Sequence, residues 1–66
     1  MKGIVKWFNN AKGYGFIKGE DGNDVFIHYS NILCEGYKTL NAENKVEYSI
    51  KHTDKGLHAE ELIIIN

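Results

Sequence analysis

Two short segments of this 66-residue chain place aromatic rings on alternate residues. The segment KGYGFI carries Tyr14 and Phe16, and the segment DVFIHYS carries Phe26 and His28. Alternate side chains of an extended strand point to the same face, so each pair of rings shares one surface. Flat rings on a sheet accept the faces of unpaired nucleobases, and each stacked base contributes about 1–3 kcal/mol. The spacing therefore indicates a surface on which single-stranded nucleic acid could stack.

The residues between these rings indicate the opposite, core-facing side of the same strands. Gly15, Ile17, Val25 and Ile27 are small or aliphatic, and a chain this short supports only one small core. The aliphatic side chains that we expect to fill it are Val5, Ile17, Val25, Ile27, Ile32, Leu40, Val46, Ile50 and Leu62. Six rings are then expected to lie wholly or partly outside: Trp7, Phe8, Tyr14, Phe16, Phe26 and Tyr29. An exposed aromatic patch usually marks a binding surface.

Charge is distributed unevenly along the chain, although the net charge is only -1. Residues 1–18 contain four lysines and no acid, whereas residues 19–66 contain the other four lysines and all nine acids. The positive part coincides with the aromatic part, which suggests a nucleic-acid face on an otherwise acidic protein. Without the aromatic rings, four lysines on a solvated strand would not indicate nucleic-acid binding.

Composition argues against a disulfide-rich secreted scaffold and against a membrane-spanning protein. The single cysteine, Cys34, excludes an internal disulfide, and small secreted scaffolds usually contain several. The sequence contains neither a signal-peptide pattern nor a run long enough to span a membrane. It also lacks a glycine loop that would bind nucleotide phosphates, so no cofactor is expected. We predict one cytoplasmic, monomeric domain over residues 1–66.

Strand patterns dominate the chain, and no amphipathic helix of useful length is predicted. Expected strands cover residues 2–9, 14–18, 24–28, 45–51 and 57–64, with a turn of 3₁₀ helix near residues 30–33. In the fourth strand, Val46, Tyr48 and Ile50 share one face. Five short antiparallel strands in so small an all-β chain favour a closed or nearly closed barrel, because closure removes exposed strand edges.

Roles follow from residue type and position. The expected stacking residues are Trp7, Tyr14, Phe16, Phe26 and His28, flanked by Phe8 and Tyr29. Lys6 and Lys12 are expected to meet phosphates, and Tyr37 and Lys38 to fold over one end of the bound strand. Asp24 either accepts a hydrogen bond from a base edge or ends a strand. Gly13 and Gly15 either keep the sheet surface low for bases or merely permit a turn and a bend.

Four segments, KWFN, KGYGFI, DVFIHYS and GYKTL, make nearly the whole chain resemble the bacterial cold-shock protein family. The second and third are similar to that family's two ribonucleoprotein motifs. The resemblance implies a five-stranded antiparallel barrel of oligonucleotide/oligosaccharide-binding (OB) type. It also implies binding of single-stranded RNA and DNA, often pyrimidine-rich, and work as an RNA chaperone and regulator of transcription or translation in cold adaptation. The family's ligand contacts fall on Lys6, Trp7, Phe8, Asn9, Lys12, Tyr14, Phe16, Asp24, Phe26, His28, Tyr29, Tyr37 and Lys38.

The chain departs from the family pattern at a few positions. Cys34 and Glu43 stand where glycine is common, and Leu57 stands where proline is usual, which leaves the contribution of the last hairpin open. His58 in that hairpin could still contact a base. The Ile63–Ile65 run is more apolar than the family pattern, so it either packs under the barrel or favours self-association.

Three other functions compete with nucleic-acid binding as explanations of these residues. Catalysis by Asp24 and His28 is disfavoured, because residues four apart on a strand are too distant to bond directly. A metal site is disfavoured because no pair among His28, Cys34, His52 and His58 has zinc-finger spacing. A barrel that docks peptides in an aromatic groove is the remaining alternative. The lysines among the rings, and the lack of acids there, argue against it.

Overall fold

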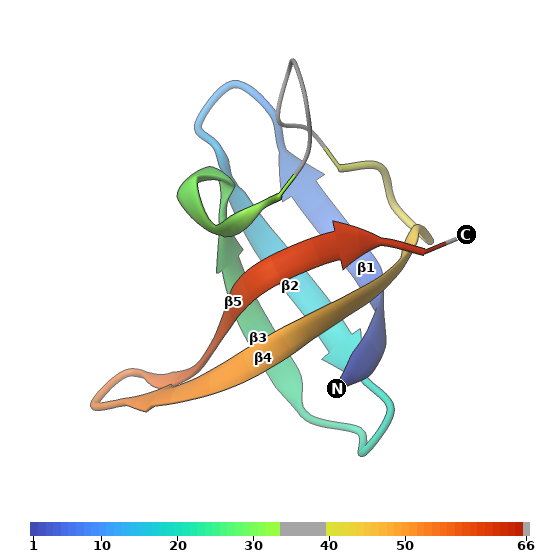
Figure 1. Ribbon diagram of the computed structural model, residues 1–66. Helices are drawn as coiled ribbons and strands as arrows, with labels where there is room; N and C mark the ends of the chain where they lie inside the picture. The colour runs from blue at the N-terminus through green and yellow to red at the C-terminus, as the bar shows by residue number, and fades with distance from the viewer. Residues whose placement is uncertain (34–39, 66) are drawn as a thin grey trace.

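The computed structural model describes residues 1–33 and 40–65 and is built from five strands (Figure 1). They are β1 (Lys2–Asn9), β2 (Tyr14–Gly19), β3 (Asp24–His28), β4 (Lys45–Thr53) and β5 (Gly56–Ile64), with a 3₁₀ turn, η1, at Tyr29–Asn31. All five predicted strands are confirmed. β1 and β3 have the predicted bounds, and the other three are one or two residues longer. Among the described residues, no helix has the length and apolar character needed to cross a membrane.

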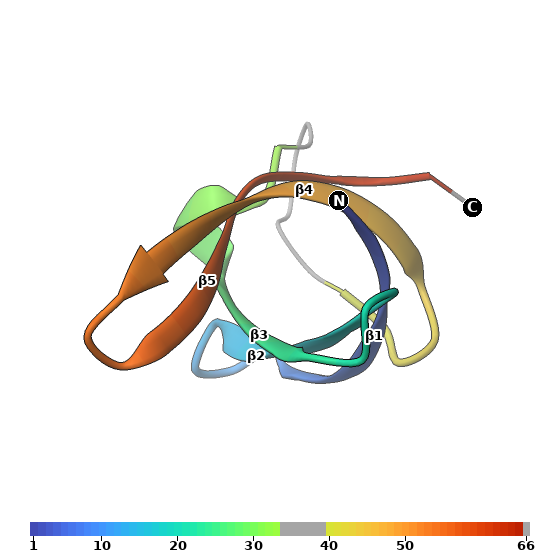
Figure 2. The same cartoon turned by 90° about the horizontal axis from the view of Figure 1, so that it is seen from below.

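The strands close into a barrel in the order β1-β2-β3-β5-β4, which Figure 2 shows from one end. Four neighbouring pairs are antiparallel, and β3 runs parallel to β5 where Phe26 meets His58. A ring with an odd number of strands cannot alternate direction throughout, so one parallel pair is unavoidable. The predicted all-β, five-stranded barrel is confirmed, with this one parallel contact where antiparallel pairing was expected.

The barrel interior is filled mainly by the expected aliphatic side chains. Buried members of the core are Val5, Ile17, Val25, Ile27, Ile32, Leu40, Val46, Tyr48, Ala59 and Leu62. Ile50 is only partly buried and packs against this cluster. The expectation that aliphatic residues alone occupy the interior is wrong at Tyr48, which is 3% exposed. Strand alternation in β4 places this ring on the same side as Val46, and the core accommodates it.

The Tyr48 ring reaches the end of the barrel at which β1 begins and β2 ends. Its hydroxyl would lie 3.0 Å from a Cβ on Gly3 and 3.1 Å from one on Gly19, so the two glycines leave room for it. The hydroxyl oxygen is buried and has no hydrogen-bond partner among the described residues. Burial raises the pKa of Tyr48, and the negative charges of Asp21 and Glu20 raise it further.

We expect Tyr48→Phe to stabilise the protein by about 1–2 kcal/mol at neutral pH, because a buried hydroxyl without a partner is costly. The tyrosine of the unfolded chain ionises near pH 10, whereas the folded-state pKa is higher. Folding of the Tyr48 protein is therefore increasingly disfavoured as the pH rises above about 10, up to the folded-state pKa. Urea unfolding at pH 7 and 10.5 should show the advantage of the variant widening. An equal or smaller advantage at pH 10.5 would contradict this, since the lysines titrate in both proteins.

Candidate nucleic-acid interface

Aromatic side chains on the outer face of β1, β2 and β3 form one contiguous cluster. Strand register pairs Trp7 with Phe16 and Phe16 with Phe26. The ring centroids of these pairs are 5.7 and 5.6 Å apart, and Tyr14 lies 6.0 Å from both Trp7 and Phe26. Trp7 meets Tyr14 at 72° and Phe16 meets Phe26 at 75°. Trp7 and Phe16 are tilted by 50°, whereas Tyr14 and Phe26 lie closer to parallel, at 26°. The rings thus meet at mixed angles, with edge-to-face contacts at Trp7–Tyr14 and Phe16–Phe26.

His58 of β5 extends the cluster across the parallel strand contact. Its ring centroid lies 5.0 Å from that of Phe26, and the two residues are partners in the β3–β5 register. We define the ring platform as Trp7, Tyr14, Phe16, Phe26 and His58. The sequence offered His58 only as a residue of the last hairpin that could contact a base, and did not place it beside the other rings. The pairing of β3 with β5, which is not encoded in a local pattern, brings it to the platform.

A β-bulge at Lys6 explains why Trp7 faces outward. The β1–β2 register shifts between Val5 and Trp7, so Lys6 is an extra residue in β1. Strict alternation would place Trp7 on the inner face with Val5, whereas the extra residue turns it outward, and it is 44% exposed. Phe8 consequently turns inward. The expectation that Phe8 flanks the stacking rings is not met, because it packs against the core.

The two glycines near the rings have structural roles. Gly13 has a φ of 81° in the turn between β1 and β2, a conformation that favours glycine. Gly15 is buried on the inner face, where a Cβ would lie 2.7 Å from Phe8 Cα. Neither glycine lowers the outer surface for bases. The structure therefore supports the alternative in which the two glycines permit a turn and a bend.

Lysines and one carboxylate lie at the edge of the ring platform. Lys6 Nζ is 3.4 Å from both carboxylate oxygens of Asp24, and Lys18 Nζ is 3.7 Å from one of them. All three side chains are about half exposed, and exposed ion pairs contribute only about 0–1 kcal/mol. Phosphates could therefore replace Asp24 as partners of these lysines at little cost.

The turn before β2 and the residues after β3 carry other predicted contacts. Asn9 Oδ1 accepts a hydrogen bond from the Lys12 backbone N–H at 2.9 Å, which orders the turn that presents Lys12. His28 Nδ1 lies 2.9 Å from Ser30 Oγ, and the His28 ring centroid is 4.5 Å from that of Tyr29. Although register places His28 beside Tyr14, its ring contact is with Tyr29. Tyr37 and Lys38 lie outside the described residues.

A cleft of about 460 Å³ opens between the platform and the hairpin that joins β4 to β5. Its lining consists of Phe16, Asp24, Phe26, Lys55, Gly56, Leu57 and His58. The cleft joins three platform rings to both a lysine and a carboxylate, so a base that stacks there would also have polar groups within the same site.

The described residues offer little for catalysis or metal binding. Asp24 contacts lysines and His28 contacts Ser30, and the two residues occupy opposite ends of β3. In residues 1–33 and 40–65, no group of three histidine, cysteine or acidic side chains could hold a metal ion. Cys34 lies outside these ranges.

The surface of rings and lysines agrees with comparisons to known proteins. Residues 1–65 match the family described as 'Cold-shock' DNA-binding domain. The chain belongs to this cold-shock domain family. Nucleic-acid binding without a catalytic role is what this family and the names of its members indicate.

Curated relatives of this cold-shock domain cover most of its length. Cold shock-like protein CspD of Haemophilus influenzae is 55% identical over 64 residues, which are 96% of this chain and 89% of that protein. Major cold shock protein CspA of Pseudomonas aeruginosa is 46% identical over 65 residues, covering 98% and 94% of the two chains. The solved structure of drosophila Unr CSD456 matches with a TM-score of 0.74 at 16% identity. This match covers 98% of the cold-shock domain and 26% of that longer chain, and it supports the fold alone.

Two departures from the usual family pattern have a structural counterpart in this cold-shock domain. Glu43 has a φ of 73°, a left-handed conformation that favours glycine, the residue common there in the family. Leu57, which replaces the usual proline, is partly buried and packs against the core. The hairpin that carries it is thus anchored beside the platform.

Proposed function

We propose that this cold-shock domain binds single-stranded RNA and DNA, preferentially pyrimidine-rich, by stacking bases on the ring platform. The observation that carries the proposal is the continuous chain of ring contacts from Trp7 to His58. These rings occupy the outer face of a sheet whose inner face fills the core. Aromatic rings of this kind accept any base without reading its edge, and a modest preference for pyrimidine runs would come from stacking strength and backbone flexibility.

Cations and polar groups around the platform would hold the backbone of the bound strand. Lys6 and Lys12 meet phosphates at the edge of the rings, and Asp24 offers a carboxylate to a base edge. The remaining expected contacts are Phe8, Asn9, His28, Tyr29, Tyr37 and Lys38. Phe8 would act from beneath, by supporting the bulge that turns Trp7 outward, because its own ring packs on the core.

Capture of unpaired bases would make the protein an RNA chaperone that uses no ATP. A domain that binds only open strands shifts weak hairpins toward the open state by its differential affinity for it. Regulation of transcription or translation in the cold would follow from this shift, since hairpins become more stable at low temperature. The proposed working form is a cytoplasmic monomer.

Competition binding separates this function from the peptide-docking alternative. Fluorescence of the single tryptophan, Trp7, reports on the platform directly. We expect hexathymidine to change the fluorescence saturably, and neither a duplex of the same sequence nor a proline-rich peptide to displace it. A saturable fluorescence response to the peptide, with none to the oligonucleotide, would favour a protein-interaction barrel instead.

Binding of hexathymidine should depend only weakly on salt, because few lysines border the platform. A single strand that contacts Z phosphates gives a slope of log K against log salt concentration of about -0.7Z. Four lysines, Lys6, Lys12, Lys18 and Lys55, therefore predict a slope of about -3. Titrations at four salt concentrations would measure it. A slope of about -4 or steeper, corresponding to six or more phosphates, would contradict the prediction.

A further inference from the structure

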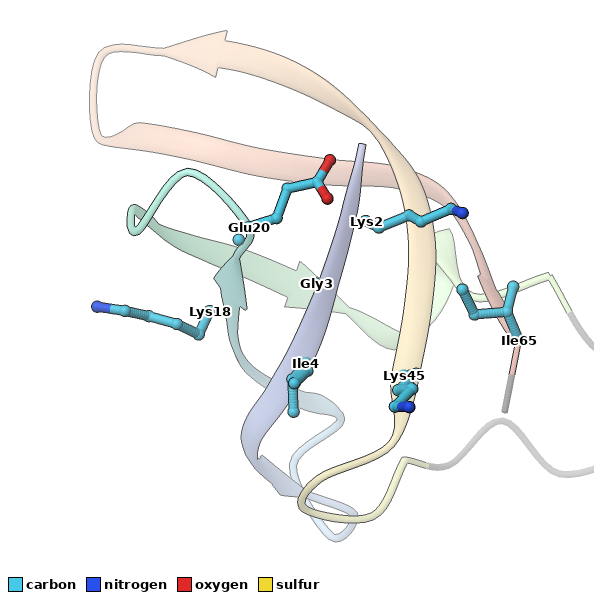
Figure 3. Close-up of a pocket in the computed structure, with 8 residues that line it drawn as sticks. Lys2, Gly3, Ile4, Lys18, Glu20, Lys45 and Ile65 are labelled. Atoms are coloured by element: carbon cyan, nitrogen blue, oxygen red, sulfur yellow. The ribbon is translucent and has the colours of Figure 1, made fainter.

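A second groove, of about 490 Å³, runs along the outer wall of the barrel beside the first half of β1 (Figure 3). Its lining consists of Lys2, Gly3, Ile4, Lys18, Gly19, Glu20, Lys45 and Ile65. None of these residues belongs to the ring platform or to the contacts predicted from sequence. Figure 3 shows Ile4 between Lys18 and Lys45, with Glu20 toward the beginning of β1.

Strand register explains how the groove combines apolar and positive residues. Ile4 pairs with Lys18 on one side and with Lys45 on the other. The Ile65 backbone N–H donates to the Lys45 carbonyl at 2.9 Å, which adds a second isoleucine to the same row. The row across β2, β1, β4 and the residue after β5 therefore alternates between lysine and isoleucine.

The isoleucines of this row are unusually accessible for their type. Ile4 is 47% exposed and Ile65 is 42% exposed. The terminal isoleucine run therefore does not pack under the barrel, which was one of the two expectations for it. The lining contains three lysines and one glutamate, so its net charge is positive and fits an anionic partner with apolar parts.

The groove continues directly from the ring platform. Tyr14, Phe16 and Lys18 are successive outward positions of β2, about 6.6 Å apart along the strand at 3.3 Å per residue. Lys18 lines the groove and also pairs with Asp24, which lines the cleft beside Phe16. A strand that leaves the platform past Asp24 therefore meets the groove next.

We propose that the groove binds the continuation of the nucleic-acid strand held on the ring platform. Lys18 contacts the phosphate at the junction with the platform, and Lys2 and Lys45 contact two further phosphates. Ile4 and Ile65 cover the apolar faces of its sugars and bases. The site would thus accommodate strands longer than the platform alone can cover. This inference rests on the proposed function, since it assigns a second segment of the same ligand.

A second copy of the chain fits the groove less well. In a two-fold dimer the same patch faces itself, so the positive linings would be brought together. Like charges placed opposite each other across an interface are unfavourable. Nucleic acid, in contrast, supplies a negative phosphate for each lysine.

The test uses hexathymidine extended by four abasic deoxyribose phosphates at its 5′ or its 3′ end. Abasic units add charge but no base, so they create no new stacking registers. We expect one of the two extensions to tighten binding roughly tenfold at 0.15 M salt and to steepen the salt slope by about 1.4, as two further phosphate contacts would. An extension with uncharged methylphosphonate linkages should bind as the hexamer does. Trp7 fluorescence measures each dissociation constant.

Matched variants assign the gain to the groove. The double variant Lys2→Gln/Lys45→Gln should lose the gain from the extension, while Lys51→Gln, which removes a lysine of β4 outside the groove, should keep it. The Ile4 and Ile65 methyl resonances should shift with the extended strand and not with the hexamer.

Three results would overturn the inference. The first is that neither the 5′ nor the 3′ extension tightens binding, and the second is that the double variant keeps the tightening. The third is that oligoglutamate or self-association, instead of the extended strand, shifts the Ile4 and Ile65 methyl resonances. All three leave hexamer binding, and with it the proposed function, intact. If the hexamer itself did not bind, both the proposed function and the inference about the groove would be wrong.

Discussion

Replacement of Phe26 by alanine is expected to weaken hexathymidine binding about 5- to 150-fold, equivalent to about 1–3 kcal/mol. Phe26 contacts three of the other platform rings, those of Tyr14, Phe16 and His58. It is half-buried and does not belong to the core cluster. The variant should therefore remain folded, and Trp7 fluorescence, together with a thermal melt, would measure both properties.

Phe26→Leu provides the matched control, because leucine keeps an apolar side chain but lacks an aromatic face. If bases stack on the ring, this variant should lose most of the affinity that Phe26→Ala loses while staying closer to the parent protein in stability. Parent-like affinity of the leucine variant would show that apolar contact, rather than stacking, holds the ligand. Unfolding of both variants, with undiminished affinity in the folded fraction, would assign Phe26 to the core.

Replacement of Gly15 by alanine is expected to lower the free energy of unfolding by about 3 kcal/mol, at the upper end for overpacking. A Cβ there would lie 2.7 Å from Phe8 Cα and 2.9 Å from Phe8 Cδ1. Main-chain atoms of β1 cannot yield without disturbing the bulge at Lys6. Urea unfolding would measure the loss, and a shifted Trp7 emission in the folded variant would show that the bulge has moved.

Gly22→Ala separates this steric effect from backbone conformation. A Cβ at Gly22 meets no atom within 4 Å, while its φ of 91° disfavours alanine. Its expected cost is about 1–2 kcal/mol from conformation alone. A Gly15→Ala protein as stable as the parent would refute the close approach of β2 to β1.

Alternation along β2 and β3 was sufficient to predict which side chains face the core and which carry the outward rings. Ile17, Val25 and Ile27 are buried, and Phe16 and Phe26 lie outside the core. The period of two is undisturbed in these strands, so residue type and position determine the face. The same alternation in β4 places the Tyr48 ring in the core beside Val46, whereas an argument from ring size alone would place it on the surface.

Features that depend on contacts between distant segments could not be predicted in this way. The bulge at Lys6 inverts the faces of Trp7 and Phe8, and residue types along β1 do not show where an extra residue lies. His58 reaches the platform only because β5 closes the barrel against β3. The groove likewise needs the beginning of β4 beside β1, and Ile65, the residue after β5, beside β4. Pairing between distant strands provides this placement.

The role of the bases is tested most directly by titrating Trp7 fluorescence with hexathymidine and with a hexamer of abasic deoxyribose phosphates. The two ligands carry the same charge, but only the first has rings to stack. Three or more stacked bases predict that hexathymidine binds at least about 100-fold more tightly. Equal affinity for the two hexamers would contradict the assignment of the ring platform as a base-stacking surface.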